Sequence, residues 1–257
     1  MASAQHLDSQ SLVSSVSLLF RAGERPRAQD VRELAHESGQ FSLSIDPAKE
    51  GGVDEGWLEL LATGLTFDLT GLSPHKAHPV PASVHSFACA RDFDQSELEA
   101  ITLSPGPHLA SSGVIMFPVV RCLALLAAQL TQLSGVQAVA WHPARAISAP
   151  DYFRRGVFGW VDGGAFPGLG LTALVTNPDG SLQSEGLDIF TGQELLLPAE
   201  MCADRSQAAK IALRLLNWLV EHGRIGQTFA FTGPDGEPLV LEPQGETGFL
   251  HLWRGAT

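Results

Sequence analysis

Short segments in which apolar and polar residues alternate are more numerous in this sequence than segments with helical periodicity. Alternation with a period of two is typical of half-buried strands, and it occurs at Phe41–Ile45 and Leu65–Leu69. The tetrapeptides Asn177–Gly180 and Gly233–Gly236 each contain Pro-Asp-Gly between two strand-like segments, a composition that favours a tight turn. Because strands and helices do not alternate regularly, we predict an α+β fold with a largely antiparallel mixed sheet and packed helices.

Two longer segments have apolar residues at the three- and four-residue spacing of an amphipathic helix. They span Pro118–Leu133 and Asp204–His222, and a glycine follows each of them within two residues, as is common where helices end. Asp204 followed by Gln207 has the spacing of a capping box. Shorter helices are predicted at Ala28–Glu37, Gly56–Ala62, Asp92–Ala100 and Asp151–Val161.

The first 145 residues have the order strand–helix–strand–strand–helix–strand of a ferredoxin-like unit, provided that Phe41–Ile45 and Leu65–Leu69 share one strand position or one of them is an addition. Helix and hairpin elements follow this portion. We expect residues 1–10 to form a flexible N-terminus and residues 11–257 a single compact domain, with a possible internal division near residues 145–150. Further strands are predicted at Leu12–Phe20, Ser83–Ala90, Val136–Trp141 and Leu169–Thr176, and a connection at Leu103–Gly113.

The charge balance argues against two classes of partner. The chain has 16 basic and 28 acidic residues and a formal net charge of −12, so its surface repels nucleic-acid phosphates and anionic lipids. The longest apolar run, Val114–Val120, is too short to span a bilayer. Three widely spaced cysteines and the absence of a signal-peptide pattern at the N-terminus predict a cytoplasmic protein.

The segment Val136–Arg145 contains the clearest candidate for a binding or catalytic site, because a predicted buried strand ends there in polar residues. His142 has the side chain of a general base, and Arg145 has a guanidinium suited to carboxylates and phosphates. Tyr152 and Arg154, in the next predicted helix, complete the candidate ligand-binding set. The alternative is structural: His142 bonds to local backbone groups, and Arg145 pairs with an acidic residue.

Four possible zinc ligands lie close together in the sequence: His75, His78, His85 and Cys89. A zinc site needs side chains that converge on one point, and a His-x-x-His sequence in a proline-rich loop does not establish this. The alternative is three surface histidines and a buried thiol. We therefore predict no metal and no cofactor, and keep these four residues as weak candidates.

Several stretches resemble the bacterial DUF4261 family of uncharacterised proteins. They are VVRCLALLAAQL, GVQAVAWHPAR and APDYF, followed by GGAFPGLGLTAL, EGLDIFTGQELLL and AAKIALRLLNWLVEHG. The likeness covers roughly residues 80–242 and concerns the order of elements more than invariant motifs. It implies an α+β domain, and it implies no activity and no catalytic residues for this chain.

The sequence favours a non-catalytic, bacterial-type protein that binds another protein or a second copy of itself. The aromatic side chains of Tyr152 and Trp160 are candidate interface residues, since tyrosine and tryptophan often anchor interfaces. Motifs such as a phosphate loop or a Gly-x-Ser-x-Gly elbow are missing from the sequence. The alternative is an enzyme or small-anion-binding protein with a pocket around His142, Arg145 and Tyr152.

Overall fold

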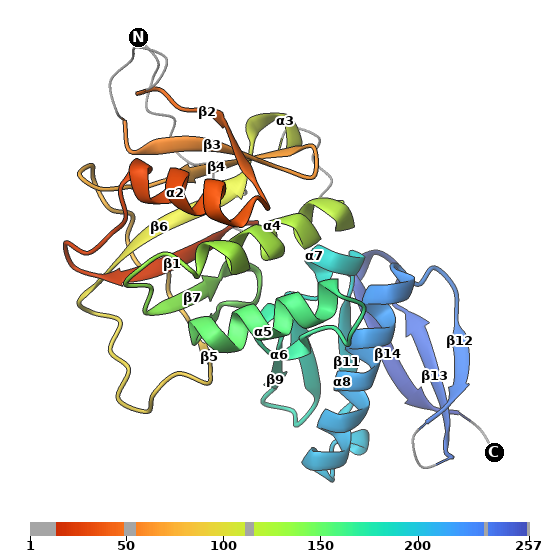
Figure 1. Ribbon diagram of the computed structural model, residues 1–257. Coiled ribbons are helices and arrows are strands. Elements are labelled where there is room, and N and C mark those ends of the chain that lie inside the picture. Colours follow the sequence, from red (N-terminus) through yellow and green to blue (C-terminus); the bar gives the residue numbers. More distant parts are fainter. Residues whose placement is uncertain (1–13, 49–54, 111–115, 234–235, 256–257) are drawn as a thin grey trace.

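Two mixed sheets, mostly antiparallel, and the helices packed against them form an α+β protein (Figure 1). This computed structural model describes residues 14–48, 55–110, 116–233 and 236–255. The predicted fold class is therefore confirmed. The flexible N-terminus expected at residues 1–10, and the beginning of the strand expected from Leu12, lie outside the described residues.

The first sheet is built by strands up to residue 148, and its pairings are antiparallel except that between β5 and β8. Helices α2 (Ala28–Ser38) and α4 (Phe117–Leu130) cover one of its faces (Figure 1). Across the sheet the strands are β2 (Ser42–Ile45), β3 (Trp57–Ala62), β4 (Leu65–Thr70), β6 (Leu98–Pro105), β1 (Val16–Arg21), β7 (Ala138–Trp141), β8 (Ala146–Ser148) and β5 (His85–Phe87).

The element order predicted for a ferredoxin-like portion occurs within this sheet, but its third strand is β6 and not the predicted strand at Ser83–Ala90, which lies at the edge of the sheet as β5. Along the chain, β1, α2, β4, β6, α4 and β7 follow the order strand–helix–strand–strand–helix–strand, and the four strands pair side by side as β7-β1-β6-β4. The strands β2 and β3 extend the sheet beyond β4, and β8 and β5 extend it beyond β7. Val16, Leu18 and Phe20 of β1 pack in the main core, whereas Leu19 packs in a second cluster with Ala100. Both faces of the central strand are therefore buried.

The helix predicted at Gly56–Ala62 is wrong, because this segment forms strand β3. Its side chains alternate between half-buried and buried, with Leu58, Leu60 and Ala62 facing the core. Thr63 and Gly64 then have positive φ angles of 50° and 80°, as in the two-residue turns that match the twist of a hairpin. In so short a segment, adjacent leucines fit the periodicity of a helix and that of a strand equally well. The segment forms a strand because it pairs with β4.

Two further predictions in the middle of the chain are wrong. No helix forms within Asp92–Ala100, and the eight-residue strand β6 already begins at Leu98. The connection predicted at Leu103–Gly113 contains the last three residues of β6 and the helix α3 (Pro107–Ala110), and residues 111–113 lie outside the described residues. Pro105 lies at the end of β6, opposite Phe67, where proline removes few ladder hydrogen bonds. The predicted strand at Ser83–Ala90 shortens to the three residues of β5.

The second sheet is built by strands from residue 173 onward and is covered on one face by α8 (Arg205–His222) (Figure 1). The side chain of Asp204 caps this helix as predicted, accepting hydrogen bonds from the N–H groups of Ser206 and Gln207 at 2.9 and 3.0 Å. The segments on either side of each predicted tight turn pair as antiparallel strands. Among the described residues of this sheet, only β11 and β14 pair in parallel. Across the sheet the strands are β12 (Phe229–Thr232), β13 (Pro238–Pro243), β14 (Phe249–Arg254), β11 (Glu194–Leu197), β10 (Leu182–Glu185) and β9 (Ala173–Thr176).

Short helices and an aromatic cluster lie between the two sheets. Trp141 of β7, Trp160, Phe166 and Phe190 pack together with ring centroids 5.0 to 6.2 Å apart. All four residues are buried, with 1% to 8% of each exposed. The remaining elements are α3 (Pro107–Ala110), α5 (Pro150–Val161), α6 (Gly168–Leu171), α7 (Asp188–Thr191) and the 3₁₀ turns His142–Ala144, Ala199–Met201 and Gly245–Thr247.

Candidate binding site

His142 lies directly after β7, where its imidazole is held by hydroxyl groups of β1 and the residues before it. The hydroxyl oxygen of Ser15 is 2.9 Å from Nδ1, and that of Ser17 is 2.9 Å from Nε2. Ser17 is in turn 2.9 Å from the hydroxyl of Thr102 on β6. Both ring nitrogens therefore have side-chain hydroxyl partners from a distant part of the chain, and not the local backbone partners of the structural alternative.

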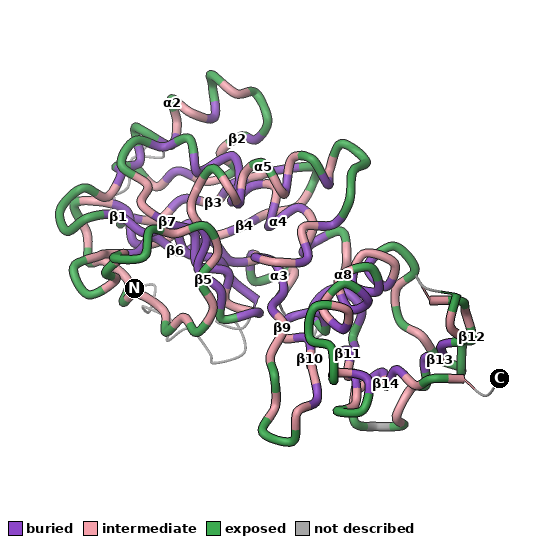
Figure 2. The backbone as a smooth tube through the Cα atoms, turned by 90° about the horizontal axis from the view of Figure 1, so that it is seen from below, coloured by how far each residue is buried: buried purple, intermediate pink, exposed green. Residues whose placement is uncertain are grey.

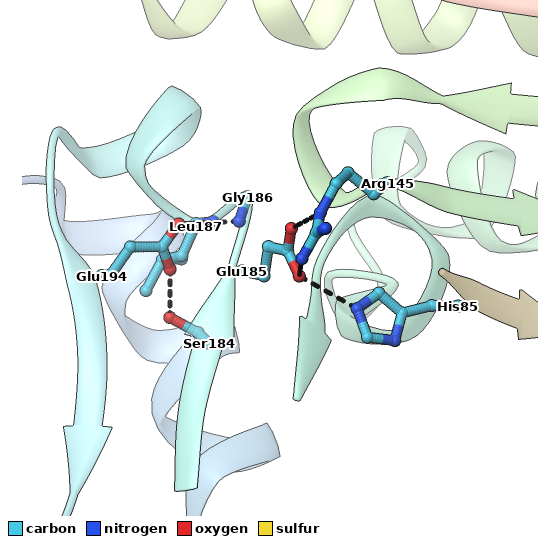
Figure 3. Close-up of polar contacts among 7 residues, drawn as sticks. All are labelled: His85, Arg145, Ser184, Glu185, Gly186, Leu187 and Glu194. Atoms are coloured by element: carbon cyan, nitrogen blue, oxygen red, sulfur yellow. Dashed lines mark hydrogen bonds and ion pairs between the residues drawn. The ribbon is translucent and has the colours of Figure 1, made fainter. Parts of the chain in front are cut away.

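Arg145 also has a protein partner, the carboxylate of Glu185 on β10. Its Nη2 donates to Glu185 Oε2 at 3.0 Å and its Nε donates to Oε1. His85 of β5 lies on the same carboxylate, with Nε2 3.0 Å from Oε2 (Figure 3). Residues of the first sheet thus hold an acidic residue of the second sheet between them. Gly186 follows Glu185, and a Cβ atom there would lie only 2.9 Å from the backbone of Ala144, so the close approach of the two segments requires glycine.

The pKa of Glu185 is lowered by this arrangement. Burial alone would raise it, but the hydrogen bonds and charges of Arg145 and His85 outweigh burial and hold the pKa below its ordinary value of 4.5. The ionised form is thus favoured in the folded protein. The three residues form an ion-pair junction between the sheets.

We expect this junction to stabilise the fold at neutral pH and to lose its effect in acid. Because the folded-state pKa of Glu185 lies below 4.5, its contribution is present above pH 4.5 and is lost as the pH falls through the lowered pKa. Glu185→Gln should reduce the free energy of unfolding at pH 7 by about 1 kcal/mol or less, since the pair is partly exposed, and the deficit should vanish at acidic pH. Urea denaturation at a series of pH values measures this deficit.

The control is Asp151→Asn, which removes the exposed Asp151–Arg154 pair. An equal deficit in both variants at every pH would contradict the expectation.

Tyr152 and Arg154 do not join His142 and Arg145 around one ligand. The hydroxyl of Tyr152 donates to the Leu169 carbonyl at 3.0 Å, and its ring stacks on Phe87. Burial raises the pKa of the Tyr152 hydroxyl. The cavity beside Tyr152 measures about 10 Å³ and is lined by neither His142 nor Arg145; this is room for about one water molecule. Arg154 pairs with Asp151 on the surface of α5, at 2.7 Å.

Trp160, the other predicted interface residue, belongs to the core. Its side chain is 8% exposed, and it makes edge-to-face contacts with Phe117, Phe166 and Phe190. We therefore do not include Trp160 in a proposed interface.

The weak metal candidates have separate surroundings. His78 pairs through its backbone with Ala100, and its pKa is lowered by burial and by the charges of Arg25 and Lys76. His85 binds Glu185, and the thiol of Cys89 lies 3.7 Å from the carbonyl of Phe87. Within the part of the chain that the structure describes, no three His, Cys, Asp or Glu side chains are grouped to hold a metal ion.

A second carboxylate near the junction, Glu194 of β11, carries no signal in the sequence. It accepts hydrogen bonds from the hydroxyl of Ser184 and from the N–H groups of Gly186 and Leu187, the latter two at 2.7 and 3.0 Å (Figure 3). The N–H group of Asp188 also donates to it, at 3.3 Å. Burial raises its pKa to about 7, opposed by the hydrogen bond from Ser184 and supported by the charge of Asp188. Glu194 thereby closes the turn between β10 and α7.

A hollow larger than the cavity beside Tyr152 lies elsewhere, between α8 and the hairpin of β12 and β13. This groove has a volume of about 360 Å³, within the range of natural ligand sites. Arg214, Phe229 and Thr232 of its lining are exposed, so it is open to solvent. Its lining consists of Ile211, Arg214, Leu215, Trp218, Phe229, Phe231, Thr232, Gly233 and Leu241.

Stacked rings form one wall of this groove and connect the helix to the strand. Trp218 of α8 stacks on Phe229 of β12 with centroids 5.0 Å apart, and Phe229 stacks on Phe231 at 6.0 Å. On the helix, the ring of His222 stacks on Trp218 at 4.2 Å. Phe229 remains 41% exposed, so part of its ring offers apolar surface to the solvent.

Comparison with known proteins assigns no relative to this chain: no protein-family model, curated protein or solved structure matches it. The resemblance to the DUF4261 family stays a prediction. No helix among the described residues is both long and apolar enough to cross a membrane.

Proposed function

We propose that this protein is a binding module that takes an apolar segment of a partner protein into the groove between α8 and β12. The observation that carries the proposal is Phe229, an exposed aromatic residue on an edge strand, set in an open apolar groove of about 360 Å³. Aromatic residues beside an open apolar hollow are typical of the anchor points of protein interfaces.

The shape of the groove favours a segment of a protein over an enclosed small molecule. Phe229 and Thr232, on one side, and Arg214, on the other, are exposed, so a ligand enters from the side and remains accessible along its length. Figure 2 shows β12 at the outside of the molecule, with little of it buried. A partner segment would cover Phe229 and extend beyond the groove, which gives it more area to bury than the hollow itself offers.

Peptide selection tests this function directly. Random twelve-residue peptides displayed on phage are selected on the wild-type protein, and the recovered peptides are synthesised and titrated. We expect peptides enriched in apolar residues, and we expect Phe229→Ala to weaken their binding at least about tenfold, as an aromatic anchor does. The matched control is Val84→Ser, which removes an apolar side chain that is 60% exposed but lies outside the groove.

The position of the peptide is measured independently of the variants. Binding in the groove should shift the indole N–H resonance of Trp218, which lines it, and leave that of the buried Trp141 unchanged. This measurement remains informative if Phe229→Ala alters the hairpin. Peptides that bind Phe229→Ala and wild-type protein equally, without moving the Trp218 signal, would show that the groove is not the binding site.

A further inference from the structure

We propose that the partner segment binds as an added strand along the free edge of β12, and that it carries an acidic residue on the same face as its apolar residues. This inference rests on the proposed function of the groove and adds to it the geometry and the charge of the partner. Its ligand class is therefore an extended peptide with apolar and acidic residues two positions apart.

The free edge of β12 offers backbone groups for such a strand. Among the residues that the structure describes, β12 ends the second sheet and pairs only with β13. The N–H of Gly233 bonds to the carbonyl of Glu237 on the β13 side. The backbone N–H and C=O groups alternate in direction along an antiparallel strand. Those of Phe231 and Phe229 therefore point toward β13, like those of Gly233, and those of Ala230 and Thr232 point away from β13.

The other features of β12 leave this edge open. Sheet edges are commonly protected by charged side chains, prolines or bulges, and the sequence Phe-Ala-Phe-Thr of β12 contains no charge and no proline. Its pairing with β13 has no bulge, whereas the edge strand β2 of the first sheet has an irregular register at Leu43 and Ile45. The edge of β12 therefore has the character of a strand that accepts another strand.

An added strand would also complete the groove. Phe229 and Phe231 are two residues apart and both line it, so the face of β12 that carries them is the face toward α8. In a strand added beside β12, every second side chain lies on this face. Apolar residues at these positions would cover the exposed ring of Phe229.

The positively charged side chains of α8 favour the binding of an acidic segment. Arg214 lines the groove, and Lys210 is exposed one helical turn before it. Among the described residues, no carboxylate forms an ion pair with either of them. Arg214 therefore presents positive charge at the groove, and Lys210 adds positive charge to the same helix outside the groove lining, in a protein whose net charge is −12. A carboxylate in line with the apolar residues of the added strand would meet this charge.

The same charges argue against a second copy of this chain as the occupant. If β12 paired with β12 of another copy around a two-fold axis, both α8 helices would lie on one face of the joined sheet. Their Arg214 and Lys210 side chains would then face like charges across the axis, and two chains of net charge −12 would also repel each other. A partner with acidic residues avoids the first of these costs.

The test uses a heptapeptide with glutamate at the first and seventh positions, valine at the third and fifth positions, and threonine at the second, fourth and sixth positions. We expect it to bind the full chain and to shift the amide resonances of Ala230 and Thr232. Ala230→Pro should weaken binding about tenfold, because it removes an outward N–H group, and the loss of one hydrogen bond lowers affinity by up to about this factor. The fold should survive, since proline is tolerated at an edge position of this kind. Ala230→Ser, which keeps the N–H group, is the matched control and should bind like the wild type.

The charge is tested with a peptide in which lysine replaces both glutamates. We expect it to bind more weakly than the glutamate peptide, and we expect Arg214→Gln to weaken only the glutamate peptide, about threefold and less at high salt, as for an exposed ion pair.

The outcomes separate this inference from the proposed function. If phage-selected peptides require Phe229 but are insensitive to Ala230→Pro, the groove binds partners and strand addition is wrong. If the lysine peptide binds as well as the glutamate peptide, the acidic partner is wrong. Sedimentation that shows a dimer of the wild type and a monomer of Ala230→Pro would identify a second copy as the occupant and overturn the inference.

Discussion

Replacing Phe190 by alanine is expected to lower the free energy of unfolding by about 3–5 kcal/mol, the range for removing a buried phenylalanine ring. Phe190 lies in α7 and is 5% exposed. Its ring contacts Phe166 at 5.0 Å, Trp160 at 6.1 Å and Trp141 at 6.2 Å between centroids. The substitution leaves a cavity beside the rings of Trp141, Trp160 and Phe166, so collapse around it would require these three rings to move.

The position of Phe190 makes this loss informative about the whole molecule. Trp141 belongs to β7 of the first sheet, Trp160 to α5, and α7 connects β10 and β11 of the second sheet. Urea denaturation followed by far-ultraviolet circular dichroism measures the loss. Phe229→Ala removes the same atoms at a position that is 41% exposed, and it should cost clearly less because exposed surface contributes no burial. Equal losses in the two variants would show that the cluster does not hold the middle of the fold together.

The elements that the sequence predicted well are those whose signals are local. The helix that begins after Asp204 has its cap, its apolar stripe and its terminal glycine within one continuous segment. The hairpin of β9 and β10 has its turn residues between its own strands. By contrast, β3 is only six residues long, and a run of this length fits a strand and a helical turn equally. Its pairing with β4 makes it a strand. Such pairing depends on two segments, so the local sequence of β3 does not predict it.

The candidate binding site depends on contacts between distant segments, which explains why the sequence placed it elsewhere. The aromatic residues of Asp151–Val161 suggested an interface, but Phe190, thirty residues after Trp160, covers the tryptophan ring. The edge position of β12 is likewise set by β14, which inserts between β13 and β11 although it is the last strand of the chain. Neither arrangement follows from local periodicity. The ion-pair junction was half predicted: Arg145 was expected to bind a carboxylate, and that carboxylate is Glu185 of the chain itself.

Glu194 should make the protein less stable as the pH rises from about 4.5 to about 7. Its pKa is about 7 in the folded protein, mainly because of burial, compared with an ordinary value of 4.5. The folded state therefore binds more protons than the unfolded state in this window, and its free energy of unfolding falls with increasing pH. A difference of this size corresponds to a loss on the order of 3 kcal/mol above pH 7.

Glu194→Gln isolates this effect, because the neutral amide resembles the protonated carboxyl group. The amide oxygen can accept hydrogen bonds from the N–H groups of Gly186 and Leu187. The amide NH₂ group can donate to the hydroxyl oxygen of Ser184, which also accepts a hydrogen bond from the N–H group of Leu195 at 2.8 Å. We expect the variant to match the wild type below pH 4.5 and to exceed its stability above pH 7. Urea denaturation of both proteins across this range measures the difference.

Glu185→Gln is the matched control, since it changes the neighbouring carboxylate whose pKa is shifted in the opposite direction. Its deficit should grow as the pH rises through the acidic range, whereas Glu194→Gln should gain stability relative to the wild type at higher pH. A Glu194→Gln variant that is less stable than the wild type at pH 8 would show that the three backbone N–H groups favour the ionised carboxylate more than burial opposes it. The turn between β10 and α7 would then be held by a charge rather than by a neutral group.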